Sequence, residues 1–240
     1  MHEKLSLEHV SKTRVHVGQT VKILSDISAS VAPSDIYTIL GPSGSGKSTL
    51  LRLINRLDDP SSGRILLDGQ DINSFNVLSL RRRAGMVFQS AAVFDGTVDD
   101  NIQYGARLTG RKLDSAELLR RVGLPEEFVT RDAASLSGGE QQRISIARTL
   151  ATNPDILLMD EPTSSLDPAA RIQIEDLVLK MNSDGLTIVF VTHDMEQAER
   201  IGTRTMLLVG GEKIEEAPTS EFFLNPQTEA ARLFIDGKLV

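Results

Sequence analysis

A glycine-rich segment that begins at residue 41 has the residue types and the spacing that bind phosphate. The pattern G-x-x-x-x-G-K-[ST] is matched at every position by Gly41-Pro42-Ser43-Gly44-Ser45-Gly46-Lys47-Ser48, with Thr49 following. Glycines let backbone N–H groups turn toward phosphate oxygens, and the helix that the pattern opens adds a positive dipole end. We therefore expect this loop to bind a nucleoside triphosphate, with Lys47 on the β- and γ-phosphates and Ser48 on Mg²⁺.

Two carboxylates end an apolar stretch further along the chain, which runs from Ile156 to Met159. Phosphoryl transfer needs a carboxylate that holds the metal ion and a group that polarises the attacking water. Asp160 is the candidate Mg²⁺ ligand, and Glu161 is the candidate general base. An apolar strand that ends in two acids is by itself usually a solvated strand end, so this prediction depends on the phosphate-binding loop.

A second glycine-rich segment precedes another helical pattern and offers a second anion-binding helix N-terminus. Its residues are Leu136-Ser137-Gly138-Gly139-Glu140-Gln141-Gln142-Arg143. One nucleotide cannot fill two such cradles when they lie on separate parts of one chain. His193 follows the apolar stretch from Thr187 to Val191. A lone histidine is usually a surface or packed residue, but a histidine at a strand end in a phosphate-binding chain is a candidate catalytic group.

Alternating strands and helices must position these groups. The patterns predict helices at 47–56, 139–152, 169–182 and 195–201, a helical middle at 98–129, and a last helix from 219. They predict strands at 5–10, 22–31, 36–40, 64–67, 85–89, 156–160 and 187–192, and a hairpin at 205–215. In the helix at 169–182, Ile174, Leu177, Val178 and Met181 form one apolar face. Such alternation favours a largely parallel sheet covered on both faces.

The composition limits the possible functions. The chain has 240 residues, 40% of them hydrophobic and 25% charged, which is typical of a soluble globular protein. Its net charge of -7 argues against a broad basic surface for nucleic acid. It contains no cysteine, so disulfides and thiolate chemistry are excluded. No apolar stretch approaches the length of a membrane span, and we expect any membrane role to be peripheral.

The segment at 136–143, with the phosphate-binding loop and the two acids, resembles the signature of ABC transporter ATPases, and the resemblance covers nearly the whole chain. It implies an α/β P-loop fold with a mostly parallel central sheet flanked by helices, an N-terminal antiparallel β region and an inserted helical lobe. Residues 1–240 would form a single domain. Residues 1–89 and 153–240 would make the catalytic lobe, and about 90–152 the helical lobe that carries the signature.

The same resemblance implies roles for individual residues. Gln89 is similar to the Q-loop glutamine, a Mg²⁺ ligand that senses the membrane partner, although by default it would be an ordinary polar loop residue. Asp167 is similar to the D-loop aspartate, although a helix N-cap before Pro168 explains it in part. His193 is similar to the switch histidine that contacts the γ-phosphate. The signature residues would close on the ATP of a second subunit, and they are Ser137, Gly138, Gly139, Glu140 and Gln141.

The resemblance also implies cofactors, partners and a location. ATP and Mg²⁺ would bind at the interface of a homodimer, or of a pair with a second ATPase subunit, holding two ATP. Hydrolysis would power transport through separate transmembrane permease subunits, at the cytoplasmic face of a membrane. The segment from Gln89 to Phe94 would line the groove that receives a short helix of the permease.

The chain departs from the family at the nucleotide base. ABC ATPases usually stack adenine on an aromatic residue near the N-terminus. In this chain that position falls near Arg14, and no aromatic residue lies between Met1 and Tyr37. Arg14 or His16 would cover the base instead, because a guanidinium or imidazole plane can stack. Residues 68–98 resemble the phosphate-importer ATPases and the group of bacterial iron-export and plant aluminium-tolerance ATPases. We favour the second group, which implies a role in metal export or metal tolerance.

Two other functions compete with transport. A soluble ABC ATPase that acts on ribosomes or nucleic acid usually carries two cassettes or a long coiled-coil insertion, and this chain has neither. A regulatory module that binds nucleotide without turnover would not need Lys47, Asp160, Glu161 and His193 intact. The sequence therefore favours the transport ATPase.

Overall fold

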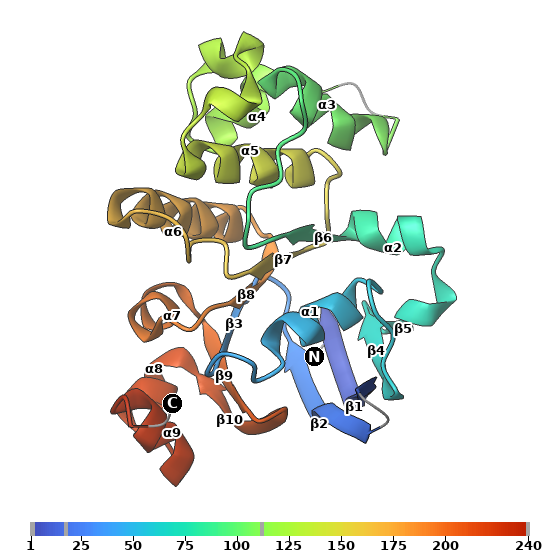
Figure 1. Cartoon of the computed structure of the whole chain (residues 1–240), viewed down its shortest axis with the longest axis vertical. Helices are drawn as coiled ribbons and strands as arrows, with labels where there is room; N and C mark the ends of the chain where they lie inside the picture. Colours follow the sequence, from blue (N-terminus) through green and yellow to red (C-terminus); the bar gives the residue numbers. More distant parts are fainter. Residues whose placement is uncertain (1–2, 17–18, 111–112, 239–240) are drawn as a thin grey trace.

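The structure is a computed structural model that describes residues 3–16, 19–110 and 113–238. Its larger sheet crosses the centre of the molecule in the strand order β10-β9-β3-β8-β7-β6 (Figure 1). The bounds are β3 (Ile36–Leu40), β6 (Ala84–Val87), β7 (Ile156–Asp160), β8 (Thr187–Val191), β9 (Arg204–Val209) and β10 (Glu212–Pro218). Neighbouring strands from β9 to β6 pair in parallel, and β10 pairs antiparallel with β9. The predicted parallel sheet and C-terminal hairpin are confirmed.

A smaller antiparallel sheet has the order β2-β1-β4-β5. It contains β1 (Leu5–His16), β2 (Gln19–Val31), β4 (Ser62–Leu67) and β5 (Gln70–Asp71), and it confirms the expected N-terminal antiparallel region. The β1 and β2 strands are longer than predicted. Register shifts interrupt β1 between Leu7 and Thr13, and its last residues are largely solvated, so no regular hydrophobic alternation marks them. The side chain of His16 lies outside the described part of the chain.

Most helices follow the predicted pattern with small shifts in their ends. They are α1 (Lys47–Ile54), α2 (Val77–Arg83), α3 (Val98–Arg107), α4 (Ser115–Arg121), α5 (Gly138–Leu150), α6 (Pro168–Ser183), α7 (Met195–Ile201), α8 (Thr219–Leu224) and α9 (Glu229–Ile235). Short 3₁₀ helices are η1 (Ile72–Ser74), η2 (Glu126–Thr130) and η3 (Ala133–Ser135). The α2 helix was not predicted, because Leu80 is its buried residue and no apolar face repeats. No helix in the described ranges is long and apolar enough to cross a bilayer.

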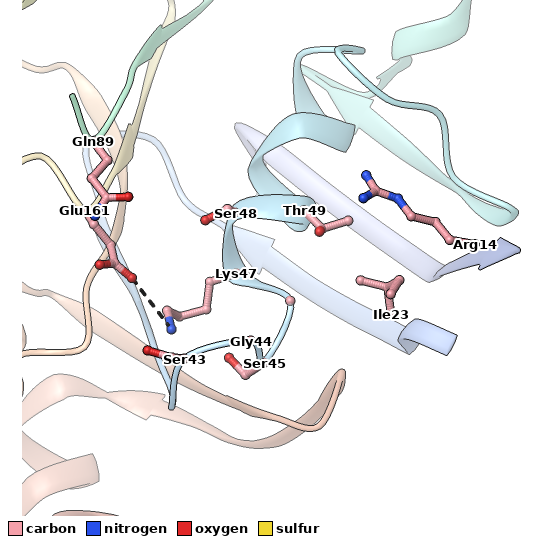
Figure 2. Close-up of a pocket in the computed structure, with 11 residues that line it drawn as sticks. Arg14, Ile23, Ser43, Gly44, Ser45, Lys47, Ser48, Thr49, Gln89 and Glu161 are labelled. Carbon is pink, nitrogen blue, oxygen red and sulfur yellow. Dashed lines mark ion pairs between the residues drawn. The ribbon is translucent and has the colours of Figure 1, made fainter. Parts of the chain in front are cut away.

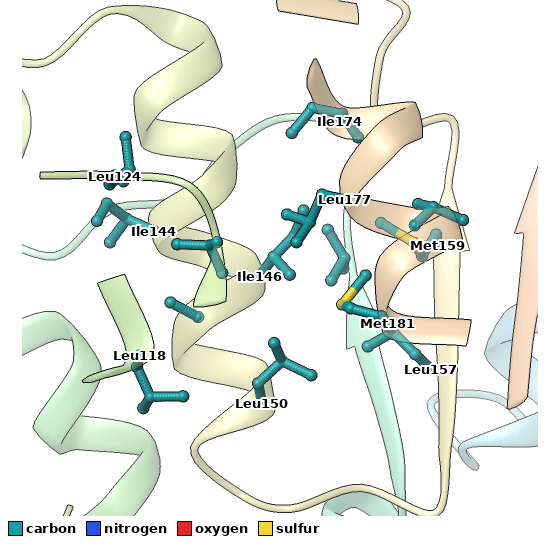
Figure 3. Packing of buried hydrophobic residues seen from close by; sticks show 14 of the residues in the cluster. Leu118, Leu124, Ile144, Ile146, Leu150, Leu157, Met159, Ile174, Leu177 and Met181 are labelled. Carbon is teal, nitrogen blue, oxygen red and sulfur yellow. The ribbon is translucent and has the colours of Figure 1, made fainter. Parts of the chain in front are cut away.

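Two hydrophobic clusters cover the two faces of the larger sheet. One joins α3, α4 and α5 to α6 and to residues such as Leu157 and Met159 of β7. In Figure 3, side chains of α5 reach toward Leu118 and Leu124 on one side and toward Leu177 of α6 on the other. The predicted apolar face of α6 is fully within this cluster. The other cluster joins α1 and the antiparallel sheet to the opposite face. Each large aliphatic side chain in these clusters stabilises the fold by about 1.5–3 kcal/mol.

Candidate active site

The phosphate-binding loop lies between the end of β3 and the start of α1. Gly41 has φ 151°, and a Cβ atom there would lie 2.0 Å from the carbonyl oxygen of Leu208, so only glycine fits. The N-cap residue of α1 is Gly46, which provides no side-chain cap. The first N–H groups of α1 can therefore bind an anion.

Lys47 lies under this loop and is only 4% exposed. Its Nζ donates hydrogen bonds to the carbonyl oxygens of Gly41, at 2.7 Å, and Pro42, at 2.9 Å. The same Nζ is 3.9 Å from Oε1 of Glu161, the ion pair that Figure 2 marks. Burial lowers the pKa of Lys47, and Glu161 and Asp160 act in the opposite direction. A phosphate group would add a further negative charge that favours the ammonium form.

Ser48 and Asp160 form the polar pair on which a cation could bind. The Oγ of Ser48 donates a hydrogen bond of 2.7 Å to Oδ1 of Asp160, the last residue of β7. Burial raises the pKa of Asp160, although the hydrogen bond from Ser48 lowers it. A hydroxyl and a carboxylate beside a phosphate-binding loop suit Mg²⁺, which binds one or two carboxylates and completes its shell with phosphate and water. The donor set therefore fits the ion.

Glu161 and His193 are brought together at the ends of β7 and β8. Glu161 has φ 44°, a backbone conformation that costs on the order of 1–3 kcal/mol for a residue other than glycine. Its N–H donates to the carbonyl oxygen of Val191 at 3.0 Å, which holds this conformation. Its Oε2 lies 3.0 Å from Nδ1 of His193, and its Oε1 faces Lys47. The carboxylate thus lies between a cation and an imidazole, beside the phosphate-binding loop.

Gln89 lies two residues beyond β6 and contributes to the same pocket. Its Nε2 donates to Oγ of Ser164 at 3.1 Å, and that hydroxyl donates to the carbonyl oxygen of Glu161 at 3.1 Å. The pocket has a volume of about 420 Å³. It is lined by Arg14, Ile23, Ser43, Gly44, Ser45, Gly46, Lys47, Ser48, Thr49, Gln89 and Glu161.

Arg14 is at the end of the pocket away from Glu161 (Figure 2). Its Nη2 is 3.0 Å from Oδ2 of Asp58, which also binds Nζ of Lys12. Asp58 therefore holds the guanidinium at the pocket wall, a role that the sequence analysis missed because the two residues are 44 positions apart. Tyr37 is buried in β3 and does not reach the pocket lining.

The second glycine-rich segment starts α5 and lies outside the 420 Å³ pocket. Ser137 is the N-cap and forms a capping box with Glu140. The Nε2 of Gln141 donates to the carbonyl oxygens of the preceding turn. Ser137 and Gly138 are exposed, whereas Gly139 is buried. Within one chain, these residues therefore do not line the pocket at the phosphate-binding loop.

Asp167 is the N-cap of α6, and its Oδ1 accepts a hydrogen bond of 3.0 Å from the N–H of Ala170. The structural interpretation of this residue is thus confirmed. Arg171, one turn further, forms an ion pair with Asp194 beside His193. This pair could not be predicted from the sequence, because nothing in the local pattern of either helix indicates it.

Comparisons with known proteins find relatives of this chain over most of its length. The sequence model of a family described as ABC transporter matches residues 24–164. YjkB of Bacillus subtilis, an ABC transporter ATP-binding protein by name, is 43% identical over 97% of this chain and 94% of its own length. Protein STAR1 of Oryza sativa is 46% identical over 87% of this chain and 62% of its own. The phosphate import ATP-binding protein PstB of Borreliella afzelii is 42% identical over 90% of this chain and 89% of its own length.

A solved structure gives a similar result. The ATP-binding cassette MJ0796, as a dimer in a post-hydrolysis state bound to ADP and Pi, matches with a TM-score of 0.81 and 34% identity. The match covers 90% of this chain and 98% of that chain.

Proposed function

This chain belongs to the ABC transporter family as an ATP-binding subunit whose ATPase activity powers transport, and we propose here how its residues bind and hydrolyse ATP. The observation that carries the proposal is the meeting of three groups at one pocket. These groups are the phosphate-binding loop, the Ser48–Asp160 pair and the Glu161–His193 pair. Together they supply the parts that phosphoryl transfer to water requires.

Each group has a defined task in hydrolysis. Lys47 exchanges its bonds to the loop carbonyls for bonds to the β- and γ-phosphates. Ser48, Asp160 and Gln89 would hold Mg²⁺, which neutralises phosphate charge when bound. Glu161 takes the proton of the attacking water, and His193 orients that carboxylate and meets the γ-phosphate. Arg14 covers the base at the other end of the pocket.

The exposed signature residues support a head-to-tail dimer. They lie outside the pocket of their own chain, and their helix N-terminus can bind an anion. In the dimer, Ser137 to Gln141 of each chain close on the ATP bound at the loop of the other. Asp167 lies beside this interface. The related cassette MJ0796 is a dimer in its post-hydrolysis state, which supports dimer formation by this chain.

A partly apolar groove beside Gln89 is the proposed docking site for the membrane subunit. Phe94 is 43% exposed, its ring is 4.8 Å from that of Tyr104, and the guanidinium of Arg148 lies 4.4 Å from its centroid. An adjoining cavity of about 280 Å³ is lined partly by Phe88, Tyr104 and Leu108. A short amphipathic helix would bury these exposed apolar side chains. The chain would then work at the cytoplasmic face of the membrane.

The cargo that we propose is a metal ion, in export or tolerance. The support is the resemblance of residues 68–98 to metal-export and metal-tolerance ATPases. Phosphate import is the second candidate, because PstB is 42% identical. Co-purification with the membrane subunit, followed by transport into vesicles, separates the two. Stimulation of ATPase activity by phosphate but not by metal ions would overturn the first candidate.

The nucleotide site itself is tested by Lys47→Ala. Loss of a charge-assisted contact should weaken ATP binding by about 1.5–3 kcal/mol. Titration calorimetry on the purified chain measures the change, and Lys180→Ala on the exposed face of α6 serves as the control. Unchanged affinity in the Lys47 variant would mean that the phosphates bind elsewhere.

A further inference from the structure

The starts of α6 and α7 are joined by an ion pair close to the proposed base. Nη1 of Arg171, in the first turn of α6, lies 2.6 Å from Oδ2 of Asp194, the N-cap of α7. The exposed fractions of the two side chains are 37% and 28%. A pair that is shielded to this degree keeps more of its attraction than a fully solvated pair does.

Asp194 forms hydrogen bonds to residues on both sides of His193. Its Oδ1 accepts the N–H of Gln197 at 3.1 Å, and its own N–H donates to Oγ1 of Thr192 at 3.0 Å. The His193 side chain is 56% exposed and has little packing of its own. Its approach to Glu161 therefore depends on where Thr192 and Asp194 hold the backbone.

Arg171 also forms a backbone hydrogen bond to Asp167, the last residue of the segment at 164–167. Its backbone N–H donates to the carbonyl oxygen of Asp167 at 2.9 Å, and Asp167 caps the same helix turn through Ala170. A cavity of about 20 Å³ is lined by Arg171, Asp194, His193 and Glu161 among others. The guanidinium thus borders the space next to the base without lining the nucleotide pocket.

We propose that Arg171 is a positioning residue for hydrolysis, because its ion pair with Asp194 fixes the start of α7 and with it the contact between His193 and Glu161. Since Arg171 is on the turn capped by Asp167, a shift of that segment on dimer formation is transmitted to His193. This inference rests on the proposed roles of Glu161 and His193. Arg171 would thereby couple the position of Asp167, beside the proposed dimer interface, to the position of His193 in the same chain.

The test is steady-state ATP hydrolysis by the purified full chain. Arg171→Ala should lower kcat by about ten- to a hundredfold, because small misplacements of catalytic groups have effects of this size. The KM for ATP should stay near the wild-type value, because the nucleotide pocket is untouched. Arg171→Lys should restore part of the loss by keeping a cation near Asp194.

Two further variants separate positioning from general packing. Asp194→Asn keeps a capping side chain but loses the charge, and its effect should not add to that of Arg171→Ala. The matched control is Arg200→Gln, since Arg200 also joins α7 to α6, through Glu175, but at the far end of α7. Arg200→Gln should keep the wild-type kcat. An equal fall in kcat for Arg200→Gln and Arg171→Ala would assign the effect to helix packing and overturn the proposal.

The proposed role of Glu161 as the base and the proposed role of Arg171 are disproved by different results. If Glu161→Gln and His193→Ala stop hydrolysis while Arg171→Ala keeps the wild-type kcat, the positioning role is wrong and the proposed site remains. If Glu161→Gln and His193→Ala both hydrolyse ATP normally, the proposed site is wrong, and the inference about Arg171 is overturned with it.

Discussion

Burial controls the charged residues of the nucleotide pocket. Lys47 and Asp160 are both nearly inaccessible to solvent. Burial lowers the pKa of Lys47 and raises the pKa of Asp160, so it favours the neutral form of each side chain. A triphosphate beside Lys47 and a cation beside Asp160 would each favour the charged form again. Nucleotide and Mg²⁺ should therefore bind more tightly together than separately.

Glu161→Gln tests the proposed base. The amide keeps the size of the side chain but cannot take a proton from water, so turnover should fall by at least about a hundredfold. ATP affinity should be unchanged, because Glu161 does not bind the phosphates in this account. Phosphate release and titration calorimetry measure the two quantities. Glu199→Gln, on the exposed face of α7, is the control. Wild-type turnover in the Glu161 variant would show that Glu161 is not the base.

Helix α5 approaches α6 closely at Gly139. A Cβ atom at this position would lie 2.7 Å from Cβ of Ala170, whereas a Cβ atom at Gly138 would lie 3.6 Å from Cδ2 of Leu166. Gly139→Ala should therefore lower the free energy of unfolding by about 1–3 kcal/mol through overpacking. Gly138→Ala is the matched control and should have little effect. Urea denaturation measures both, and equal stabilities of the two variants would contradict the close approach.

Phe94→Ala tests the proposed docking groove. Loss of a large apolar contact at the centre of an interface should weaken association with the membrane subunit by about 2 kcal/mol or more. Basal ATPase activity of the isolated chain should change little. The control is Leu224→Ala, a highly exposed apolar residue on α8. A variant that assembles normally but loses basal activity would place Phe94 in the nucleotide site or the core.

Local patterns predicted the elements that carry the chemistry. The phosphate-binding loop and the acids at 160–161 follow apolar strands and could be found in the sequence. The α2 helix has no apolar repeat and was missed. The pairs Arg14–Asp58 and Arg171–Asp194 join positions 44 and 23 residues apart, so only the folded chain reveals them. The assembly of Ser48 with Asp160 and of Glu161 with His193 follows from the parallel order of β3, β8 and β7.

The two clusters on opposite faces of the larger sheet separate residues 136–143 from the phosphate-binding loop. Helices α3, α4 and α5 lie together at one end of the molecule, away from α1 and the antiparallel sheet (Figure 1). We propose that residues of about 90–152 move as a helical lobe when the dimer closes. ATP would then join two chains, and its hydrolysis would release them.

Cross-linking between the phosphate-binding loop of one chain and the start of α5 of another tests the proposed head-to-tail dimer. The chain contains no cysteine, so a Ser43→Cys chain and a Ser137→Cys chain each carry one thiol. Both are made with Glu161→Gln and given different affinity tags, and the mixture is treated with a short bifunctional thiol reagent. We predict a cross-linked dimer that carries both tags and forms with ATP and Mg²⁺ but not without nucleotide. A mixed cross-link that fails to form, or that forms equally without ATP, would rule out the head-to-tail dimer.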